Sequence, residues 1–300
     1  MKPTVSYAIL AIGELGSMGL LALESIHKLG YSEIHAMADA PGKEWLLESF
    51  KDKEVSFKFY ELPEAIGMTL HSFGNDKYTK FGESKFFQLM YLKWILISSV
   101  LQSDSLSDYV VFTDLDVLWG RSIEDCLDRV FSDENINLAG QLDWNTKSSQ
   151  TSNYLCPGIM IWKKSESSVT MLKDIRSFHE LKLRQDVNFP DDKAINEWIR
   201  QGGNQKKVTF LSPSEFVIGH RILDLLLHRS DFEVLKFRAF HANYCTGASR
   251  KLFRMKLIST SKIFQPFRYV ASVLIICEKV VLLLIRLSTK ASTAWSSKKP

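Results

Sequence analysis

The sequence has few cysteines, and those it has are scattered. Cys126, Cys156, Cys245 and Cys277 form no Cys-x-x-Cys pair in the 300 residues. This pattern argues against a disulfide framework and against a zinc knuckle. A chain without paired thiols fits a reducing compartment, so we expect the protein to be cytoplasmic.

The sequence also lacks a strong charge of either sign. Lys and Arg number 38 and Asp and Glu 34, which gives a formal net charge of +4 without a long basic stripe. Nucleic acid binding is therefore not indicated, whereas a small anionic ligand is compatible. With 45% hydrophobic and 24% charged residues, the composition is that of an ordinary globular protein.

A signal peptide is not expected at the amino terminus. The first apolar run has only the length of a strand before Glu14, and the apolar residues that follow recur at helical spacing until Gly30. Strand, loop and helix explain this segment better than a secretory leader.

An uninterrupted membrane span is also missing near the carboxyl terminus. Residues 268–286 are mostly apolar but contain Glu278 and Lys279, and each central charge costs a spanning helix about 2.5 to 3.5 kcal/mol. Two interpretations stay open: an interfacial helix whose flanking basic residues meet anionic lipid, and a terminal helix packed on the core. We therefore divide the chain into a domain at 1–262 and an apolar helix with a basic tail at 263–300.

What the sequence does contain is an alternation of strand and helix patterns. Strand-like runs at 6–13, 33–40 and 54–62 are separated by helical patterns, and a long apolar helix is expected at 84–101. This alternation is typical of an α/β fold with a mostly parallel central sheet flanked by helices. In such folds ligands gather at the carboxyl ends of the strands.

The run DYVVFTDLDVLWG, residues 108–120, combines a buried central strand with two carboxylates, Asp114 and Asp116. Buried carboxylates need a partner. Because residues i and i+2 of a strand point to the same side, both can converge on one divalent cation. An isolated Asp-x-Asp also arises by chance, and it would suit a phosphatase, a nuclease or a sugar transferase.

The segment AFHANYCTGASRK, residues 239–251, supplies complementary groups. An alternating strand ends at His241, whose imidazole can complete a metal site, although a structural role for it stays open. Gly247 and Lys251 follow in a loop and helix start, where backbone N–H groups and an ammonium can approach a phosphate. The sequence thus predicts a metal site beside a phosphate-binding loop.

Four blocks in this order resemble the nucleotide-diphospho-sugar transferase family: YVVFTDLDVLW, YLCPGIMIWKKSE, DDKAINEWI and FHANYCTGASRK. This family consists of GT-A-fold glycosyltransferases with an Asp-x-Asp motif, related to plant cell-wall xylosyl- and arabinosyltransferases. The resemblance covers roughly residues 78–256 and implies a single GT-A-like domain. It implies that Asp114, Asp116 and His241 hold Mn²⁺ or Mg²⁺ against the diphosphate of a nucleotide sugar.

The resemblance also implies contacts with the nucleotide sugar. Lys93, on the helix before the Asp-x-Asp strand, and Gly247 and Lys251 match donor-binding positions. Gly158 is retained in the second block, but Cys156-Pro157 stands where family members commonly have Asn-Thr. We therefore do not carry over to Cys156 and Pro157 the contact with the donor sugar that the family would make at these two positions.

Three further acidic residues are candidates for the reaction. Asp143, in QLDWN, and Asp191 are the catalytic candidates for donor or acceptor contacts, with helix capping as the alternative for Asp191. Asp192 replaces a Gln of the family and is a candidate nucleotide-sugar contact that would change which sugar or acceptor is bound.

We therefore expect a metal-dependent glycosyltransferase of glycan biosynthesis. It would move a sugar from a nucleotide diphosphate sugar, with a UDP-sugar favoured, to a glycan or lipid-linked acceptor, and the resemblance suggests retention of anomeric configuration. Two alternatives stay open: a metal-dependent nucleotidyltransferase, and a catalytically degenerate fold that serves as a glycan-binding scaffold. Peripheral contact with the inner membrane face through the C-terminal helix is expected under the interfacial interpretation.

Overall fold

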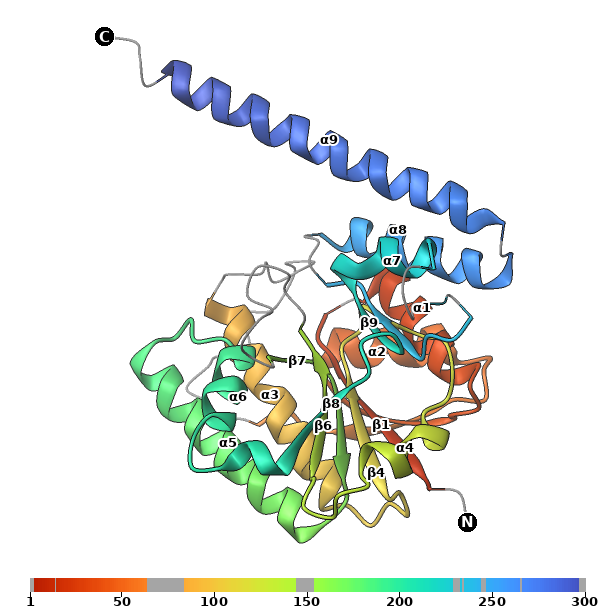
Figure 1. The fold of residues 1–300 in the computed structure, drawn as a ribbon. Helices are drawn as coiled ribbons and strands as arrows, with labels where there is room; N and C mark the ends of the chain where they lie inside the picture. Colours follow the sequence, from red (N-terminus) through yellow and green to blue (C-terminus); the bar gives the residue numbers. More distant parts are fainter. Residues whose placement is uncertain are drawn as a thin grey trace.

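A central β-sheet with helices on both faces forms the body of the molecule (Figure 1). The computed structural model describes residues 3–13, 15–63, 84–143, 154–228, 233, 235–243, 247–264 and 266–296. Cys245 and residues 78–83 of the family resemblance lie outside the described residues.

Within these ranges, seven strands form the central sheet in the order β3-β2-β1-β4-β7-β6-β8, and three form a smaller sheet in the order β5-β10-β9. The strands are β1 (Val5–Ala11), β2 (Glu33–Ala38), β3 (Ser56–Tyr60), β4 (Tyr109–Thr113), β5 (Val117–Trp119), β6 (Leu138–Leu142), β7 (Leu155–Lys163), β8 (Val208–Leu211), β9 (Phe216–Ile218) and β10 (Ala239–His241). In the central sheet only β7 runs antiparallel to its neighbours, β4 and β6. The expected mostly parallel sheet is confirmed.

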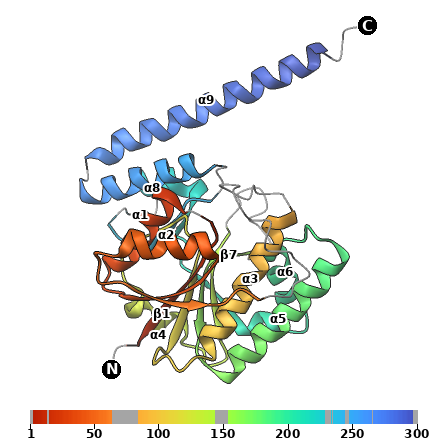
Figure 2. The ribbon, with the colours of Figure 1, turned by 180° about the vertical axis from the view of Figure 1, so that it is seen from behind.

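Helices cover both faces of this sheet (Figures 1 and 2). They are α1 (Gly16–His27), α2 (Ala40–Phe50), α3 (Ser84–Leu101), α4 (Glu124–Val130), α5 (Glu166–Gln185), α6 (Asp191–Ile199), α7 (Ile222–Leu226), α8 (Ala248–Ile263) and α9 (Phe267–Ser296), with 3-10 turns η2 (Asn204–Lys207) and η3 (Gly219–Arg221). Helices α3, α5 and α6 pack on one face, and α1, α2 and α4 on the other. The expected helix at 84–101 is confirmed as α3.

The central strands are apolar because both of their faces are covered. In β4, Val110 and Phe112 belong to the core under α3, whereas Val111 belongs to the core under α1 and α2. Alternate side chains of a strand point to opposite faces, so a strand between two helical layers needs apolar residues at every position. This explains the unbroken apolar run before Asp114.

The run at 108–120 is not one strand, and here the sequence prediction is wrong. β4 ends at Thr113, opposite Ile159 of β7 in the central sheet, and β5 begins at Val117, opposite His241 of β10 in the small sheet. Because β4 and β5 pair with strands of different sheets, the chain passes from the central sheet to the small sheet between β4 and β5. Asp114 and Asp116 lie in this crossing, so their convergence does not come from strand alternation.

The last two helices lie at the edge of the body. α9 packs on α7 and α8 through buried Ala271, Ser272 and Ile275 and then extends away from the rest of the chain (Figures 1 and 2). No helix in the described part of the chain is long and apolar enough to cross a membrane. The expected C-terminal helix is therefore present, while the division of the chain at 262/263 stays a prediction.

Candidate functional site

The predicted metal ligands come together where the two sheets meet. Asp114 and Asp116 lie in the crossing from β4 to β5, and His241 ends β10, which pairs with β5. Two backbone hydrogen bonds fix the crossing: Asp114 N–H donates to the Gly158 carbonyl at 2.8 Å, and Ala242 N–H to the Asp116 carbonyl at 2.9 Å. One possible ligand atom from each of Asp114, Asp116 and His241 lies within 4.8 Å of the others.

Asp116 is the centre of the group. Its Oδ1 lies 3.2 Å from His241 Nε2, and its Oδ2 accepts a hydrogen bond of 2.6 Å from Lys251 Nζ. His241 Nε2 also lies 4.0 Å from Asp114 Oδ2. Asp116 and His241 are buried, whereas the Asp114 side chain keeps 31% of its exposure, so the site opens at Asp114.

These neighbours shift the two aspartate pKa values in opposite directions. Burial alone would raise the pKa of Asp116, but His241 and Lys251 hold it well below its usual value. Burial raises the pKa of Asp114, and the adjacent negative charge of Asp116 adds to this rise, although Lys93 opposes it. Asp114 is thus a carboxylate whose charge the protein compensates incompletely, which is a setting that favours a bound cation.

His241 is oriented as a metal ligand would be. Its Nδ1 lies 2.8 Å from Oε1 of Gln141, which is fully buried and whose Nε2 donates to the Phe216 carbonyl at 3.3 Å. Because an amide oxygen only accepts, we assign a proton to Nδ1. Burial disfavours the charged ring, but Asp116 outweighs this effect and raises the pKa of His241, so without a cation Nε2 carries a proton toward Asp116. A bound cation would take the place of that proton at the Nε2 lone pair. Two carboxylates and one imidazole nitrogen fit Mn²⁺ or Mg²⁺.

Gln141 was missed by the sequence analysis, and its only signal is a polar residue inside an otherwise apolar strand. We expect Gln141→Leu to weaken Mn²⁺ binding about 10- to 100-fold, because the His241 ring loses the acceptor that fixes its orientation. Isothermal titration of the protein with Mn²⁺ measures this. Gln102→Leu, an exposed glutamine after α3, is the control. Equal Mn²⁺ affinity of the two variants would contradict the orienting role.

Gly158 of β7 makes room for the site. A Cβ atom at this position would lie 2.1 Å from His241 Cε1 and 2.9 Å from Asp114 Oδ2, both far inside van der Waals contact. The sequence analysis placed Gly158 at the nucleotide sugar; the structure places it directly behind two of the three candidate metal ligands.

We expect Gly158→Ala to lower kcat/KM about 100-fold, because displacing ligands by about 1 Å costs that much. Mn²⁺ affinity should fall as well. Gly30→Ala is the control: it combines a left-handed backbone with open space around the new Cβ, so it should cost stability but leave Mn²⁺ affinity intact. Wild-type Mn²⁺ affinity in Gly158→Ala would show that the ligands tolerate the methyl group.

A second charged group lies beneath the first. Lys93 of α3 is buried, and its Nζ lies 2.5 Å from Asp191 Oδ2 and 3.9 Å from Asp114 Oδ1. Burial disfavours the charge on Lys93, but the two carboxylates outweigh it and raise the pKa of Lys93. Asp191 is the first residue of α6, but the N-cap is Pro190 and no side chain makes a capping hydrogen bond there, so the helix-cap alternative for Asp191 is wrong. Its carboxylate is held by Lys93.

Asp143 and Asp192 belong to a third group, organised by Tyr154. The Tyr154 hydroxyl donates to Asp192 Oδ2 at 3.0 Å, and Asp143 N–H donates to the Tyr154 carbonyl at 2.7 Å. Burial and the neighbouring Asp191 raise the pKa of Asp192. Asp143 directly follows β6, which runs in the same direction as β4, so both strands end at the same edge of the sheet.

The predicted phosphate-binding residues start α8. Gly247 is the N-cap of this helix with φ of 91°, a conformation that favours glycine, and Lys251 lies in its first turn. The departure at Cys156 places a thiol sulfur 3.6 Å from His241 Nδ1. The structure therefore brings the metal candidates, Lys251 and Gly158 together, and links Asp191 to them through Lys93.

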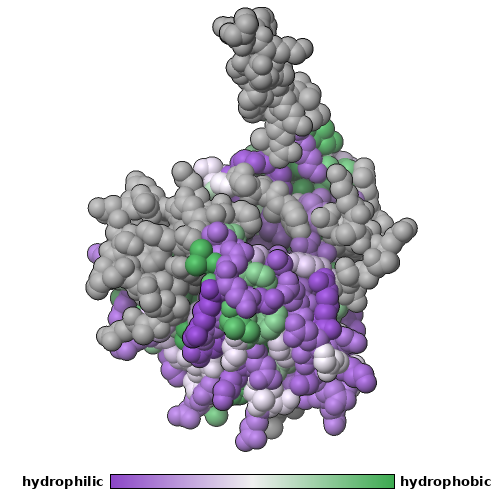
Figure 3. All heavy atoms as spheres, turned by 90° about the vertical axis from the view of Figure 1, so that its left-hand side faces the viewer, coloured by the Kyte–Doolittle hydropathy of each residue, from purple (hydrophilic) through white to green (hydrophobic). Residues whose placement is uncertain are grey.

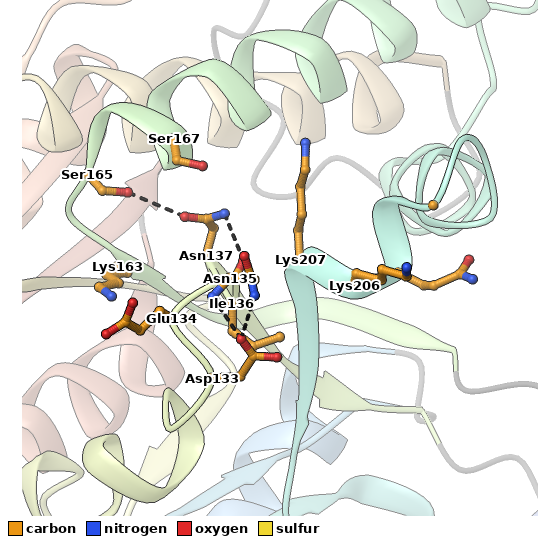
Figure 4. Close-up of a pocket in the computed structure, with 12 residues that line it drawn as sticks. Asp133, Glu134, Asn135, Ile136, Asn137, Lys163, Ser165, Ser167, Lys206 and Lys207 are labelled. Atoms are coloured by element: carbon orange, nitrogen blue, oxygen red, sulfur yellow. Dashed lines mark hydrogen bonds between the residues drawn. The ribbon is translucent and has the colours of Figure 1, made fainter.

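A separate polar cavity of about 690 Å³ lies near Lys163, the last residue of β7 (Figure 4). Its side chains bind one another: Ser165 donates to Asn137, and Asn135 donates to Asp133. None of the predicted site residues lines this cavity. We assign its lining residues a structural role.

Comparison with known proteins adds a family and a fold. The family model described as nucleotide-diphospho-sugar transferase matches residues 52–255, more than half of the chain. No protein with a curated description matches this sequence.

Solved structures agree in fold. The chain is similar to galactosyltransferase LgtC in complex with donor and acceptor sugar analogs, with 11% identity, a TM-score of 0.56, and coverage of 85% of this chain and 95% of that chain. It is also similar to mouse xyloside xylosyltransferase 1 in its apo form, with 11% identity, a TM-score of 0.53, and coverage of 81% and 99% respectively. At these identities the likeness shows a shared fold, the GT-A fold of glycosyltransferases.

Proposed function

Because the chain belongs to the nucleotide-diphospho-sugar transferase family, we propose that it moves a sugar from a UDP-sugar to a glycan or lipid-linked saccharide, with retention of anomeric configuration. Family membership makes it a nucleotide-sugar-dependent transferase; the donor base, the acceptor and the stereochemistry are the proposed part. The observation that carries the proposal is the convergence of Asp114, Asp116 and His241 with Lys251 at one opening.

Asp114, Asp116 and His241 would hold Mn²⁺ or Mg²⁺. Carboxylate oxygens suit either ion, and the imidazole nitrogen favours Mn²⁺. When bound, the cation supplies positive charge to the diphosphate that leaves.

The chain itself supplies further positive charge at the same place. Lys251 Nζ, 2.6 Å from Asp116 Oδ2, would lie against phosphate oxygens, and the backbone N–H groups that begin α8 after Gly247 would donate to them. During transfer the bond between the anomeric carbon and the phosphate oxygen breaks, and the nucleoside diphosphate keeps the electron pair. Groups already aimed at that oxygen stabilise the charge as it develops.

The remaining acidic candidates would contact the donor sugar or the acceptor. We assign Asp191 and Asp143 as the candidates that contact the donor sugar or the acceptor hydroxyl. The acceptor oxygen would form the new bond to the anomeric carbon, and its proton would pass to the departing diphosphate. Lys93 would hold Asp191 in place. Asp192, held by Tyr154, would contribute to the choice of sugar.

The experiment is a donor panel. Purified protein is incubated with UDP-, GDP- and ADP-sugars and a panel of saccharide acceptors in EDTA, Mn²⁺ or Mg²⁺, and released nucleoside diphosphate is measured. We expect release from a UDP-sugar that depends on the metal, with an NMR spectrum of the product that shows the donor's anomeric configuration. Cleavage at the α-phosphate, with release of sugar 1-phosphate in place of nucleoside diphosphate, would indicate a nucleotidyltransferase, and a folded protein that binds no nucleotide would indicate a scaffold; either result overturns the proposal.

Two further expectations belong to this proposal. We propose a cytoplasmic location, which the scattered cysteines support: Cys126, Cys156 and Cys277, the cysteines that the structure describes, are free. We also propose that residues 1–262 form the transferase domain and 263–300 a separate C-terminal element, supported by the end of α8 at Ile263.

A further inference from the structure

The side of α9 that faces away from the body is apolar over more than three turns. We call this the outer face of α9; its exposed residues are Tyr269, Val270, Val273, Leu274, Ile276, Cys277, Val280 and Val281. Their spacing places them on one side of the helix, opposite buried Ala271 and Ile275. The face covers about 18 Å along the helix axis at 1.5 Å per residue.

Of the two charges that interrupt this segment in the sequence, the acidic one does not reach the outer face, whereas Lys279 is exposed. Glu278 turns inward, where its carboxylate accepts hydrogen bonds from Arg250 Nε at 2.9 Å and from Arg254 Nε and Nη2 at 3.1 Å. Arg254 itself is buried. Glu278 is also the only acidic residue in 263–300. Two arginines of α8 therefore neutralise the one negative charge of the segment on its protein side.

The side of the molecule that carries α5 and α6 does not share this character. On the side that carries α5 and α6, hydrophilic residues predominate and hydrophobic residues form small patches (Figure 3). A continuous exposed apolar face is uncommon on soluble proteins and marks an interaction site.

We infer that the outer face of α9 docks on a lipid surface that carries anionic headgroups. Charge decides between lipid and a second copy of the chain: residues 279–300 contain Lys279, Arg286, Lys290, Lys298 and Lys299 and no acidic residue. Two copies joined along α9 would bring like charges together, whereas anionic headgroups complement them. No described helix is suited to span a membrane, so the helix lies in the plane of the interface.

The docked helix is joined to the candidate site through α8. Arg250 and Arg254 hold Glu278 of α9, and Lys251, between them in sequence, binds Asp116. The inference does not depend on which donor is used. It does place the site beside the membrane surface, where a lipid-linked acceptor would be available.

The test is flotation of the full-length protein with vesicles of phosphatidylcholine alone or mixed with phosphatidylglycerol. We expect binding to the anionic vesicles that weakens as salt is raised. The double variant Val273→Asp/Ile276→Asp should lower the partition coefficient at least about tenfold, since it puts two charges on the apolar face. The control Leu106→Asp/Leu181→Asp alters two exposed leucines elsewhere and should bind as wild type does.

Three results would overturn the inference. They are no flotation of the wild type, equal flotation of the α9 variant and the wild type, and a wild-type dimer that the α9 variant converts to monomer while vesicle binding is absent. The third result would show that the outer face of α9 binds a second copy of the chain. Circular dichroism and release of nucleoside diphosphate from a soluble donor, both unchanged in the α9 variant, confirm that it is folded.

Discussion

Asp116→Asn is expected to lower kcat/KM for nucleoside diphosphate release about 1,000-fold, a loss of about 4 kcal/mol of transition-state stabilisation. Asp116 is the residue that contacts both His241 and Lys251. The amide keeps the shape of the side chain but removes the negative charge, so it both weakens cation binding and releases Lys251 from its position.

Steady-state kinetics with the preferred donor at saturating Mn²⁺ measure this loss, and titration with Mn²⁺ separates weaker binding from slower chemistry. Asp128→Asn, the same change on the exposed side of α4, is the control and should retain wild-type kinetics. An Asp116→Asn variant within tenfold of wild type would remove Asp116 from the cation site.

Lys93→Met is expected to lower the free energy of unfolding by about 3 to 5 kcal/mol. Lys93 is 1% exposed, and its ammonium compensates Asp191 at 2.5 Å and Asp114 at 3.9 Å. Methionine matches the length of the stem and leaves a buried Asp191 carboxylate without its counter-charge, which is the costly way to break a buried ion pair. Denaturant unfolding followed by circular dichroism measures the change.

A double variant isolates the cause. Lys93→Met/Asp191→Asn removes both charges of the closer pair, so it should be more stable than Lys93→Met alone. Lys173→Met, on the exposed side of α5, should change the free energy of unfolding by no more than about 0.5 kcal/mol. If the double variant is no more stable than the single one, lost packing rather than lost charge explains the effect of Lys93.

Much of the fold was predictable because local patterns agree with tertiary packing. The apolar helix at 84–101 and the strands around Ile9 and Ile34 were found where the structure has them. The break between β4 and β5 was not predictable, because nothing in the run from Val110 to Trp119 shows that its two halves pair with different sheets. An apolar composition indicates that a strand is buried, but it does not indicate which other strand it pairs with.

The candidate site was predictable in its residue types and less so in its contacts. Asp114, Asp116 and His241 followed from motif and resemblance. The Gln141 amide that orients His241 lies 100 positions away in sequence from it, and the closeness of Gly158 to the ligands depends on the register of β7 against β4. Likewise, the sequence indicates only that Glu278 interrupts an apolar helix. In the structure its carboxylate pairs with two arginines of α8.

The ion pair between Asp116 and Lys251 closes a loop of 135 residues. Closing so long a loop is entropically unfavourable on its own, so the pair depends on the packing of β5, β10 and α8 that brings the two side chains together. A partly folded chain therefore has no site. Any ligand of this site binds the native state alone, and at a concentration 100 times its Kd it adds about 2.7 kcal/mol to the stability of the whole domain.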